Sequence, residues 1–263
     1  MQAGRIRVPA LAAAWICCIP VLAAQPPEKE PPSSSWGVGI GAAVKQKPYI
    51  GTDSEGKVIP ILQFENKYVR VFGPGIDVKL PGLRIGDTQR INVSVVGRYD
   101  LSAGYEASDS WIFSGMSERK GGIWAGAKIR WENSLANLSA EWLGDASGYS
   151  KGQRGGLGLE RSWRLGKHLM LSPRLTAKWQ DSKYVDYYFG VRDSEATAGR
   201  AAYRGVSGIS VEAGLRSLFL FGRNHSVILD IGVTKLAPEI KHSPLVGRAS
   251  ESNAFLGYVY RFR

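Results

Sequence analysis

Few residues in this sequence are of a type that could perform acid–base chemistry. The chain has three histidines, and of these His242 stands beside a nucleophile, Ser243, with Glu239 close by. A hydrolase needs its nucleophile, base and orienting acid to converge in space, and adjacency along the chain is weak evidence of that. His168 and His225 lie in or beside short predicted turns, where a histidine is ordinarily solvated. We therefore predict a non-catalytic protein without a catalytic, metal or cofactor site.

A second set of chemically capable residues is charged, and its members recur at every second position within several segments. In "LMLSPRLTAKWQ", residues 169–180, Arg174 and Lys178 share one side with Ser172 and Thr176. The candidates that we place on this side, and expect to line a lumen, are Arg98, Lys128, Arg130, Arg174, Lys178, Glu212, Arg216 and Asp230. Both signs occur on neighbouring segments, so we expect the charges to pair and fill the lumen. A narrow, weakly selective pore is the alternative.

Alternation with period two identifies the segments that carry these charges as strands. In "GIWAGAKIRWEN" Ile123, Ile129 and Trp131 fall on one face, and Lys128 and Arg130 fall on the other. Such alternation is typical of strands with one apolar face. The segments run for about 9–13 residues, whereas soluble strands are nearer 5–6 and tilted membrane-spanning strands need about 9–11. Aromatic residues gather near the segment ends, as in the girdles of membrane barrels. A soluble sandwich explains the alternation but neither the length nor the girdles.

These features predict an all-β fold, a transmembrane antiparallel up-and-down β-barrel. Short connections alternate with long ones, and in outer-membrane barrels short turns face the periplasm and long loops face outside. Counting from both ends gives twelve strands if "VRVFGPGIDVKL", residues 69–80, is a hairpin, and ten if it does not span. The chain ends in "FLGYVYRFR", in which we interpret Tyr258, Tyr260 and Phe262 as a signal for outer-membrane assembly, although Arg263 follows the phenylalanine.

The N-terminal residues predict export. Residues 1–24 have the pattern of a secretory signal peptide, with Arg5 and Arg7 before a short apolar core and small residues before the cleavage position. Both cysteines of the chain lie inside this segment, so the mature protein has no disulfide and no thiolate site. We expect residues 25–35 to form a flexible Pro/Ser-rich segment and residues 36–263 to form a single outer-membrane β-barrel.

The charge balance predicts an anionic partner. The whole chain carries a formal net charge of +11, and removing Arg5 and Arg7 leaves +9. A basic protein favours nucleic acid, lipid head groups or an acidic polymer. Export argues against nucleic acid, which leaves outer-membrane lipid, lipopolysaccharide or the cell wall. The predicted location is the outer membrane of a Gram-negative bacterium, with the protein as a monomeric barrel.

One aromatic stretch does not fit a strand. In "KYVDYYFGV", residues 183–191, Tyr184, Tyr187, Tyr188 and Phe189 lie within a long connection on the predicted extracellular side. An exposed apolar patch of this kind usually marks a contact surface. We predict that the stretch folds inward over the barrel mouth as a plug, because three of the rings are consecutive and do not keep one alternating face. The alternative is an extension of the preceding strand that adds its rings to the outer girdle.

Several stretches together resemble the MltA-interacting protein (MipA/OmpV) family of outer-membrane proteins. They are "GVGIGAAVKQKPYIGTD" (37–53), "VIPILQFE" (58–65), "YVDYYFGVRDSEA" (184–196), "AAYRGVSGISVEAGL" (201–215), "LAPEIKHSPLV" (236–246) and "GYVYRF" (257–262). The resemblance implies a non-catalytic scaffold that links a lytic transglycosylase and a murein synthase, and hence peptidoglycan hydrolysis and synthesis, at the outer membrane. It also leaves open a porin-like channel for small solutes, because other members are described as porin-like or adhesive.

Overall fold

The computed structural model describes residues 34–100 and 103–262. The predicted signal peptide, and nearly all of the predicted Pro/Ser-rich segment, lie outside the described residues. The strands are β1 Ser34–Gln46, β2 Ser54–Asn66, β3 Val69–Phe72, β4 Gly75–Lys79, β5 Leu83–Ile85, β6 Gln89–Tyr99, β7 Ile123–Glu132, β8 Asn137–Asp145, β9 Gln153–Glu160, β10 Trp163–Leu165, β11 Leu169–Gln180, β12 Gly208–Phe221, β13 His225–Lys235 and β14 Ser250–Phe262. The first strand therefore begins two residues before the predicted start of the barrel.

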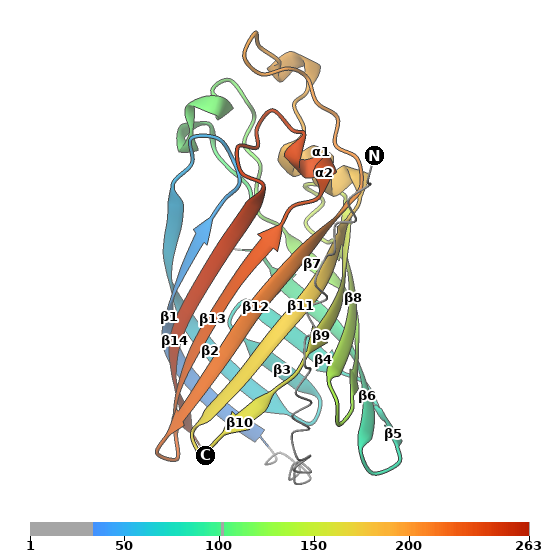
Figure 1. The fold of residues 1–263 in the computed structure, drawn as a ribbon, viewed down its shortest axis with the longest axis vertical. Coiled ribbons are helices and arrows are strands. Elements are labelled where there is room, and N and C mark those ends of the chain that lie inside the picture. Colours follow the sequence, from blue (N-terminus) through green and yellow to red (C-terminus); the bar gives the residue numbers. More distant parts are fainter. Residues whose placement is uncertain (1–33, 101–102, 263) are drawn as a thin grey trace, which may run out of the picture.

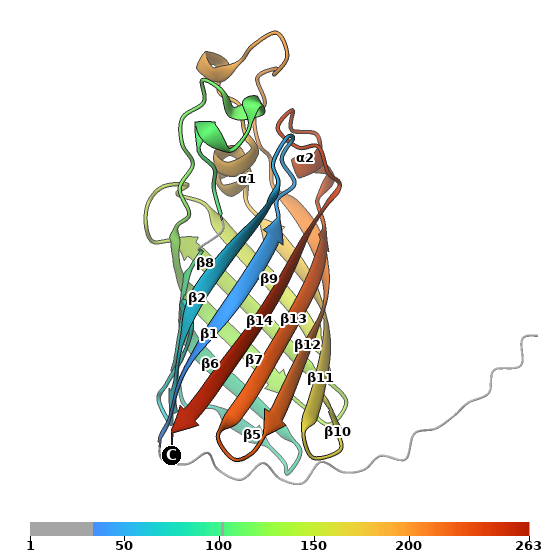
Figure 2. The same ribbon diagram turned by 90° about the vertical axis from the view of Figure 1, so that its left-hand side faces the viewer.

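All the strand pairs are antiparallel, and the sheet closes on itself as a barrel (Figure 1, Figure 2). β1 pairs with β14, with Trp36 opposite Phe262, and β9 closes the other gap by pairing with β11. β4 and β5 both pair with β6, and β9 and β10 both pair with β11, so each of these couples forms one interrupted wall strand. The fourteen segments therefore make twelve wall strands, which confirms the predicted barrel and its strand number.

The hairpin on which the count depended is real but short. β3 and β4 turn at Gly73, whose φ of +52° favours glycine, and the Gly73 N–H donates to the Leu62 carbonyl. β3 pairs with β2 only across residues 63–65. Within the described residues, the remainder of β2 toward the long loops has a strand neighbour only on its β1 side. Pro60 lies on this edge, facing the same way as Leu62, where its missing N–H removes no ladder bond.

The two faces of the wall differ as the alternation predicts. On β7, Ile123, Ile129 and Trp131 are exposed on the outside, whereas the Trp124 side chain faces inward and is fully buried. Five tryptophans of the aromatic residues expected to form girdles are exposed on the outer surface, namely Trp36, Trp131, Trp142, Trp163 and Trp179. No helix in the described part of the chain is long and apolar enough to cross a membrane. The exposed apolar outer surface is the surface that contacts lipid in an outer-membrane barrel.

A charge on this outer surface should destabilise the barrel, whereas loss of a neighbouring inward charge should leave it in the membrane. Leu175 is 52% exposed on the outer face of β11, and its neighbour Arg174 faces inward. We expect Leu175→Arg to cost about 2–4 kcal/mol if the residue lies near the bilayer midplane. Arg174→Ala should remain membrane-inserted. Heat-modifiable gel mobility measures both variants, and an equal response would contradict the assignment of the two faces.

The helices lie at one end of the barrel, on the long connections (Figure 1, Figure 2). They are α1 Ser182–Phe189, α2 Pro238–Lys241 and the 3₁₀ helices Ala107–Asp109, Trp111–Phe113 and Asp193–Glu195. Most of the buried hydrophobic side chains also gather here, not in the wall. We call residues 47–53, 103–121, 182–205 and 236–248 the extracellular cap, because long connections of outer-membrane barrels face outside.

Candidate functional site

Helix α1 contains the aromatic stretch that does not fit a strand. It begins where the Asp181 side chain accepts a hydrogen bond from the Tyr184 N–H (2.8 Å), which supplies an N-cap. Val185, Tyr188 and Phe189 are buried against the rest of the cap, while Tyr184 and Tyr187 are partly buried. Helical spacing puts Tyr184 and Tyr188 one turn apart, with ring centroids separated by 4.8 Å. The stretch is therefore a helix packed among other loops, and its role as a plug stays a prediction.

Other cap segments bind the polar groups of α1. The Tyr49 hydroxyl donates to the Tyr188 carbonyl (3.1 Å), and the Ser243 hydroxyl donates to the Phe189 carbonyl (2.6 Å). The Gly205 N–H donates to the Asp186 carboxylate (2.9 Å). The last carbonyls of a helix have no partner within it, so these contacts satisfy groups that would otherwise be orphaned. Segments far apart in the sequence are thereby joined to one short helix.

An aromatic cluster forms the apolar centre of the cap. Tyr105 and Phe113 stack with centroids 3.9 Å apart. Tyr49 lies against both of these rings and also 5.5 Å from the Phe189 ring, centroid to centroid. Burial raises the pKa of the Tyr105 phenol to about 12, so the cluster is uncharged at neutral pH. The stretch 183–191 thus shares its apolar surface with residues from two other loops.

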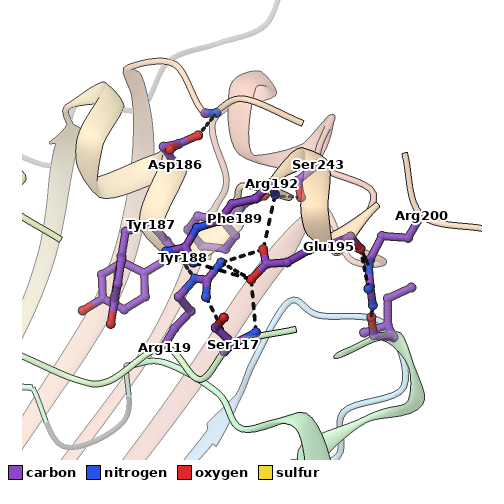
Figure 3. Close-up of polar contacts among 12 residues, drawn as sticks. Ser117, Arg119, Asp186, Tyr187, Tyr188, Phe189, Arg192, Glu195, Arg200 and Ser243 are labelled. Carbon is purple, nitrogen blue, oxygen red and sulfur yellow. Dashed lines mark hydrogen bonds and ion pairs between the residues drawn. The ribbon is translucent and has the colours of Figure 1, made fainter. Parts of the chain in front are cut away.

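A buried ion pair joins two of these loops beside α1 (Figure 3). Arg119 and Glu195 are only 3% and 5% exposed, and the Arg119 Nη2 lies 2.8 Å from the Glu195 Oε2. Arg119 also donates from Nε to the Tyr187 carbonyl and from Nη1 to the Ser117 carbonyl, both at 2.8 Å. Because the guanidinium has several donors in a fixed planar array, it contacts both segments at once.

A second buried arginine holds the same region. The Arg200 guanidinium is 4% exposed and donates to the carbonyls of Ile112, Ser114 and Glu195. The 3₁₀ helix of residues 111–113 is thereby attached to the segment that carries Glu195. Sequence reasoning did not identify Arg119, Glu195 or Arg200, because nothing in the local pattern of a loop marks an ion pair between residues this far apart.

The Glu195 carboxylate makes the cap sensitive to acid. Burial by itself raises the pKa of this carboxyl, but hydrogen bonds from the Ser117 N–H, the Arg119 guanidinium and the Arg192 N–H outweigh burial and lower the pKa below its usual range. A carboxyl with a lowered folded-state pKa contributes stability that is complete above its unfolded pKa, about 4.3, and is lost as the pH falls through the folded pKa.

We therefore expect the cap to loosen in acid below about pH 4 while the barrel stays folded. Near-ultraviolet circular dichroism of the cap tyrosines should fall over this range, whereas heat-modifiable mobility should not change. Glu195→Gln removes the titrating group, so its signal should depend less on pH. The same acid response in Glu195→Gln would contradict the assignment.

The predicted lumen residues lie on the inner side of the wall, and several are paired. The Arg174 guanidinium binds the Glu212 carboxylate (3.1 Å) and the Asp230 carboxylate (2.8 Å). Arg216 also binds Asp230, with Nε 2.8 Å from Oδ2, and Lys178 binds Glu212. These five residues come from β11, β12 and β13 and form one network of both signs.

The other half of the wall pairs less simply than its sequence suggests. Glu141 lies opposite Lys128 in the register, but its carboxylate is bound by Arg98 (3.3 Å). Arg130 binds two carboxylates, those of Glu132 and Glu160, each at 3.2 Å. The order of the strands therefore limits which charged residues can pair, and the length and direction of the side chains determine which pairs form.

Trp124 connects the lumen to the cap. Its buried ring lies 5.5 Å from the Tyr184 ring of α1, centroid to centroid, and 4.5 Å from the Arg154 guanidinium carbon. Arg154 in turn binds the Asp100 carboxylate (2.9 Å). Helix α1 thus contacts both the outer loops and the side chains at the loop end of the barrel interior.

Ser243, which belongs to the local set considered for catalysis, and the two turn histidines make contacts with other parts of the chain. The Ser243 hydroxyl is bound to the Phe189 carbonyl. The His168 Nδ1 lies 2.8 Å from the Leu220 carbonyl, and the His225 Nδ1 lies 2.7 Å from the Tyr258 hydroxyl. Among residues 34–100 and 103–262, no group of three or more side chains is arranged to hold a metal ion.

The three residues interpreted as an assembly signal lie on the last strand. Tyr258, Tyr260 and Phe262 point to the outer side of β14, where the His225 ring packs against both tyrosines. Their position at the closing seam with β1 is structural, and a role in assembly stays a prediction.

Comparison with known proteins identifies the family. The model of the family described as "MltA-interacting protein MipA" matches residues 38–262. The putative outer membrane protein YiaT of Escherichia coli (strain K12) is 24% identical over 238 residues, 88% of this chain and 92% of that protein. The MltA-interacting protein of the same organism is 23% identical over 235 residues, 86% of this chain and 90% of that protein. An outer membrane channel from Pseudomonas putida F1 matches with a TM-score of 0.43 and 11% identity, over 89% of this chain and 97% of that one. Because the family model covers nearly the whole described barrel, this chain belongs to the MltA-interacting protein (MipA) family of outer-membrane proteins.

Proposed function

We propose that this protein is a non-catalytic, monomeric scaffold that links a lytic transglycosylase with a murein synthase at the outer membrane, and that it is not an open pore. The observation that carries the proposal is the interlocked cap: α1, the loop of Arg119 and the segment of Glu195 are joined by buried contacts at the extracellular end. A scaffold would tolerate loops that close this end of the barrel, whereas a solute channel requires an open path. The name of the relative that interacts with MltA supports the choice of a transglycosylase.

Capture of the two enzymes by the purified barrel tests this function. The folded protein in detergent should retain a lytic transglycosylase and a murein synthase together, and neither should be retained by an unrelated outer-membrane barrel of similar size. Failure to retain the transglycosylase would contradict the proposal.

The competing function is a narrow channel for small solutes. It is favoured by the network around Arg174, because charged side chains rather than an apolar core occupy the inner wall. Single-channel recording in a planar bilayer separates the two functions. The scaffold predicts little or no current from the intact protein, whereas large and stable openings would establish a pore.

A further inference from the structure

The end of the barrel opposite the cap is strongly basic. It carries the short turns, which face the periplasm in outer-membrane barrels, and in Figure 1 β5, β10 and the C-terminus lie at this end. We call the following residues of strand ends and short turns the basic ring: Arg84, Arg90, Arg164, Lys167, Arg223 and Arg261. The ring comes from several positions around the barrel and not from one loop.

Four members of the ring lie on the inner side of the wall. Leu83 and Ile85 are exposed on the outside of β5, so Arg84 between them faces inward, and Arg90 is its cross-strand partner. Arg164 lies in the same way between the exposed Trp163 and Leu165. Arg261 alternates with outward-facing aromatic residues on β14. These guanidinium groups are therefore directed to the mouth of the lumen and away from surrounding lipid.

The carboxylates at this end make their ion pairs with cations outside the ring, although Glu132 lies opposite Arg90 in the register of β6 and β7. Glu65 binds Lys79 (2.6 Å), and Glu132 and Glu160 both bind Arg130. In the part of the chain that the structure describes, no ring member makes an ion pair with a carboxylate, and Asp87 in the neighbouring turn makes none either. The charged donors of the ring members are therefore not taken up by ion pairs within the chain and can contact a ligand.

Two details show that the ring is not arranged for stability. Arg84 and Arg90 are directly opposite each other across β5 and β6, and like charges in that position repel, a repulsion that Glu132 opposite Arg90 on β7 offsets only in part because it is bound to Arg130. The Arg261 Nε is buried and has no hydrogen-bond partner among the described residues, which is costly for a charged group. A bound anion would relieve both the repulsion and the unmet donor.

We propose that the basic ring binds the carboxylates of peptidoglycan stem peptides. Arginine is well suited to carboxylates because its planar donors engage both oxygens. The inward direction of four members disfavours phospholipid head groups, and their spread around the mouth fits a polymer with repeated carboxylates. The choice of murein as the polymer rests on the proposed scaffold function. Binding would hold the cell wall beside the enzymes that act on it.

Cosedimentation of the folded, full-length protein with purified sacculi, with no enzyme present, tests the proposal. We compare the parent with R84Q/R90Q/R164Q, and use K151Q/K183Q/R204Q, at exposed positions in the long connections of the opposite end, as the matched control for charge. The ring variant should bind at least about tenfold more weakly, the control variant should bind like the parent, and added salt should weaken parent binding because exposed charges are screened. Equal binding by parent and ring variant would overturn the proposal.

Additional measurements identify the ligand and allow for a variant that does not fold. The parent protein should not bind sacculi whose carboxylates are blocked as amides. Undiminished binding to these sacculi would also overturn the proposal. If polyglutamate binds the ring while sacculi do not, the partner is an acidic protein segment and the proposal fails. If the triple variant does not fold, Arg164→Gln and the charge-conserving Arg164→Lys replace it. Arg164→Gln should weaken binding more than Arg164→Lys, which keeps the charge but not the planar donors. Because no enzyme is present, failure here is distinct from failure of the scaffold, which is tested without murein.

Discussion

Replacing Arg119 by methionine should release the extracellular cap while leaving the barrel folded. The substitution removes the partner of a buried carboxylate and leaves the carbonyls of Ser117 and Tyr187 without their donor. Breaking a buried ion pair on one side costs about 3–5 kcal/mol, chiefly because the remaining charge is buried without compensation. The barrel should survive, because its wall strands pair with one another and do not depend on Arg119.

Limited proteolysis of intact cells measures the release, since the cap faces the medium. Arg119→Met should be cleaved within the cap far faster than the parent, while heat-modifiable mobility is kept. The double variant Arg119→Met/Glu195→Leu removes both charges and should regain much of the protection, which isolates the ion pair from the packing. Arg119→Lys should recover little, because an ammonium group does not reproduce the planar contacts to three acceptor groups. Equal protection of the single variant and the parent would show that the pair does not hold the cap.

The wall of this barrel could be predicted from the sequence because the alternation of apolar and polar residues depends only on neighbouring positions in a strand. A strand between lipid and lumen must alternate, so residues such as Ile129 and Lys128 are sorted by neighbouring positions alone. The number of strands followed from the alternation of short and long connections, because short turns face the periplasm and long loops face outside. The hairpin of β3 and β4 was the weak point because each half is short for a membrane-spanning strand. In the structure it is part of the wall, but it pairs with β2 only across residues 63–65.

The site could be predicted only in part, because its contacts join residues that are far apart in the sequence. The aromatic residues of 183–191 indicated burial, but a single turn of apolar residues does not separate a helix from an irregular loop. Its partners include Arg119 and Tyr49, which lie 68 and 139 residues from the groups they bind, and no pattern within a loop reports such contacts. For the same reason Arg98 was expected in the lumen, while its bond to Glu141 was not.

Deleting residues 184–190 should produce a folded barrel whose single-channel conductance is well above that of the parent. The deletion removes the buried side chains Val185, Tyr188 and Phe189, and it removes the acceptor groups that the Tyr49 and Ser243 hydroxyls bind. It also removes the Tyr184 ring that lies against Trp124 at the top of the lumen. The loops then lose their shared apolar centre, so water gains access to the lumen from outside. The wall strands β11 and β12 keep their pairing, because the deleted residues lie outside both.

Replacement of the same seven residues by a Gly/Ser sequence of equal length is the matched variant, because it keeps the loop length while removing α1. Both variants should conduct, whereas Lys183→Gln, which alters one exposed residue of the helix, should remain like the parent. Folding is checked by heat-modifiable mobility before recording. A folded deletion variant without increased conductance would mean that α1 fastens the loops to one another without closing the lumen. In that case the paired charges around Arg174 and Asp230, not the cap, would be what keeps the lumen closed.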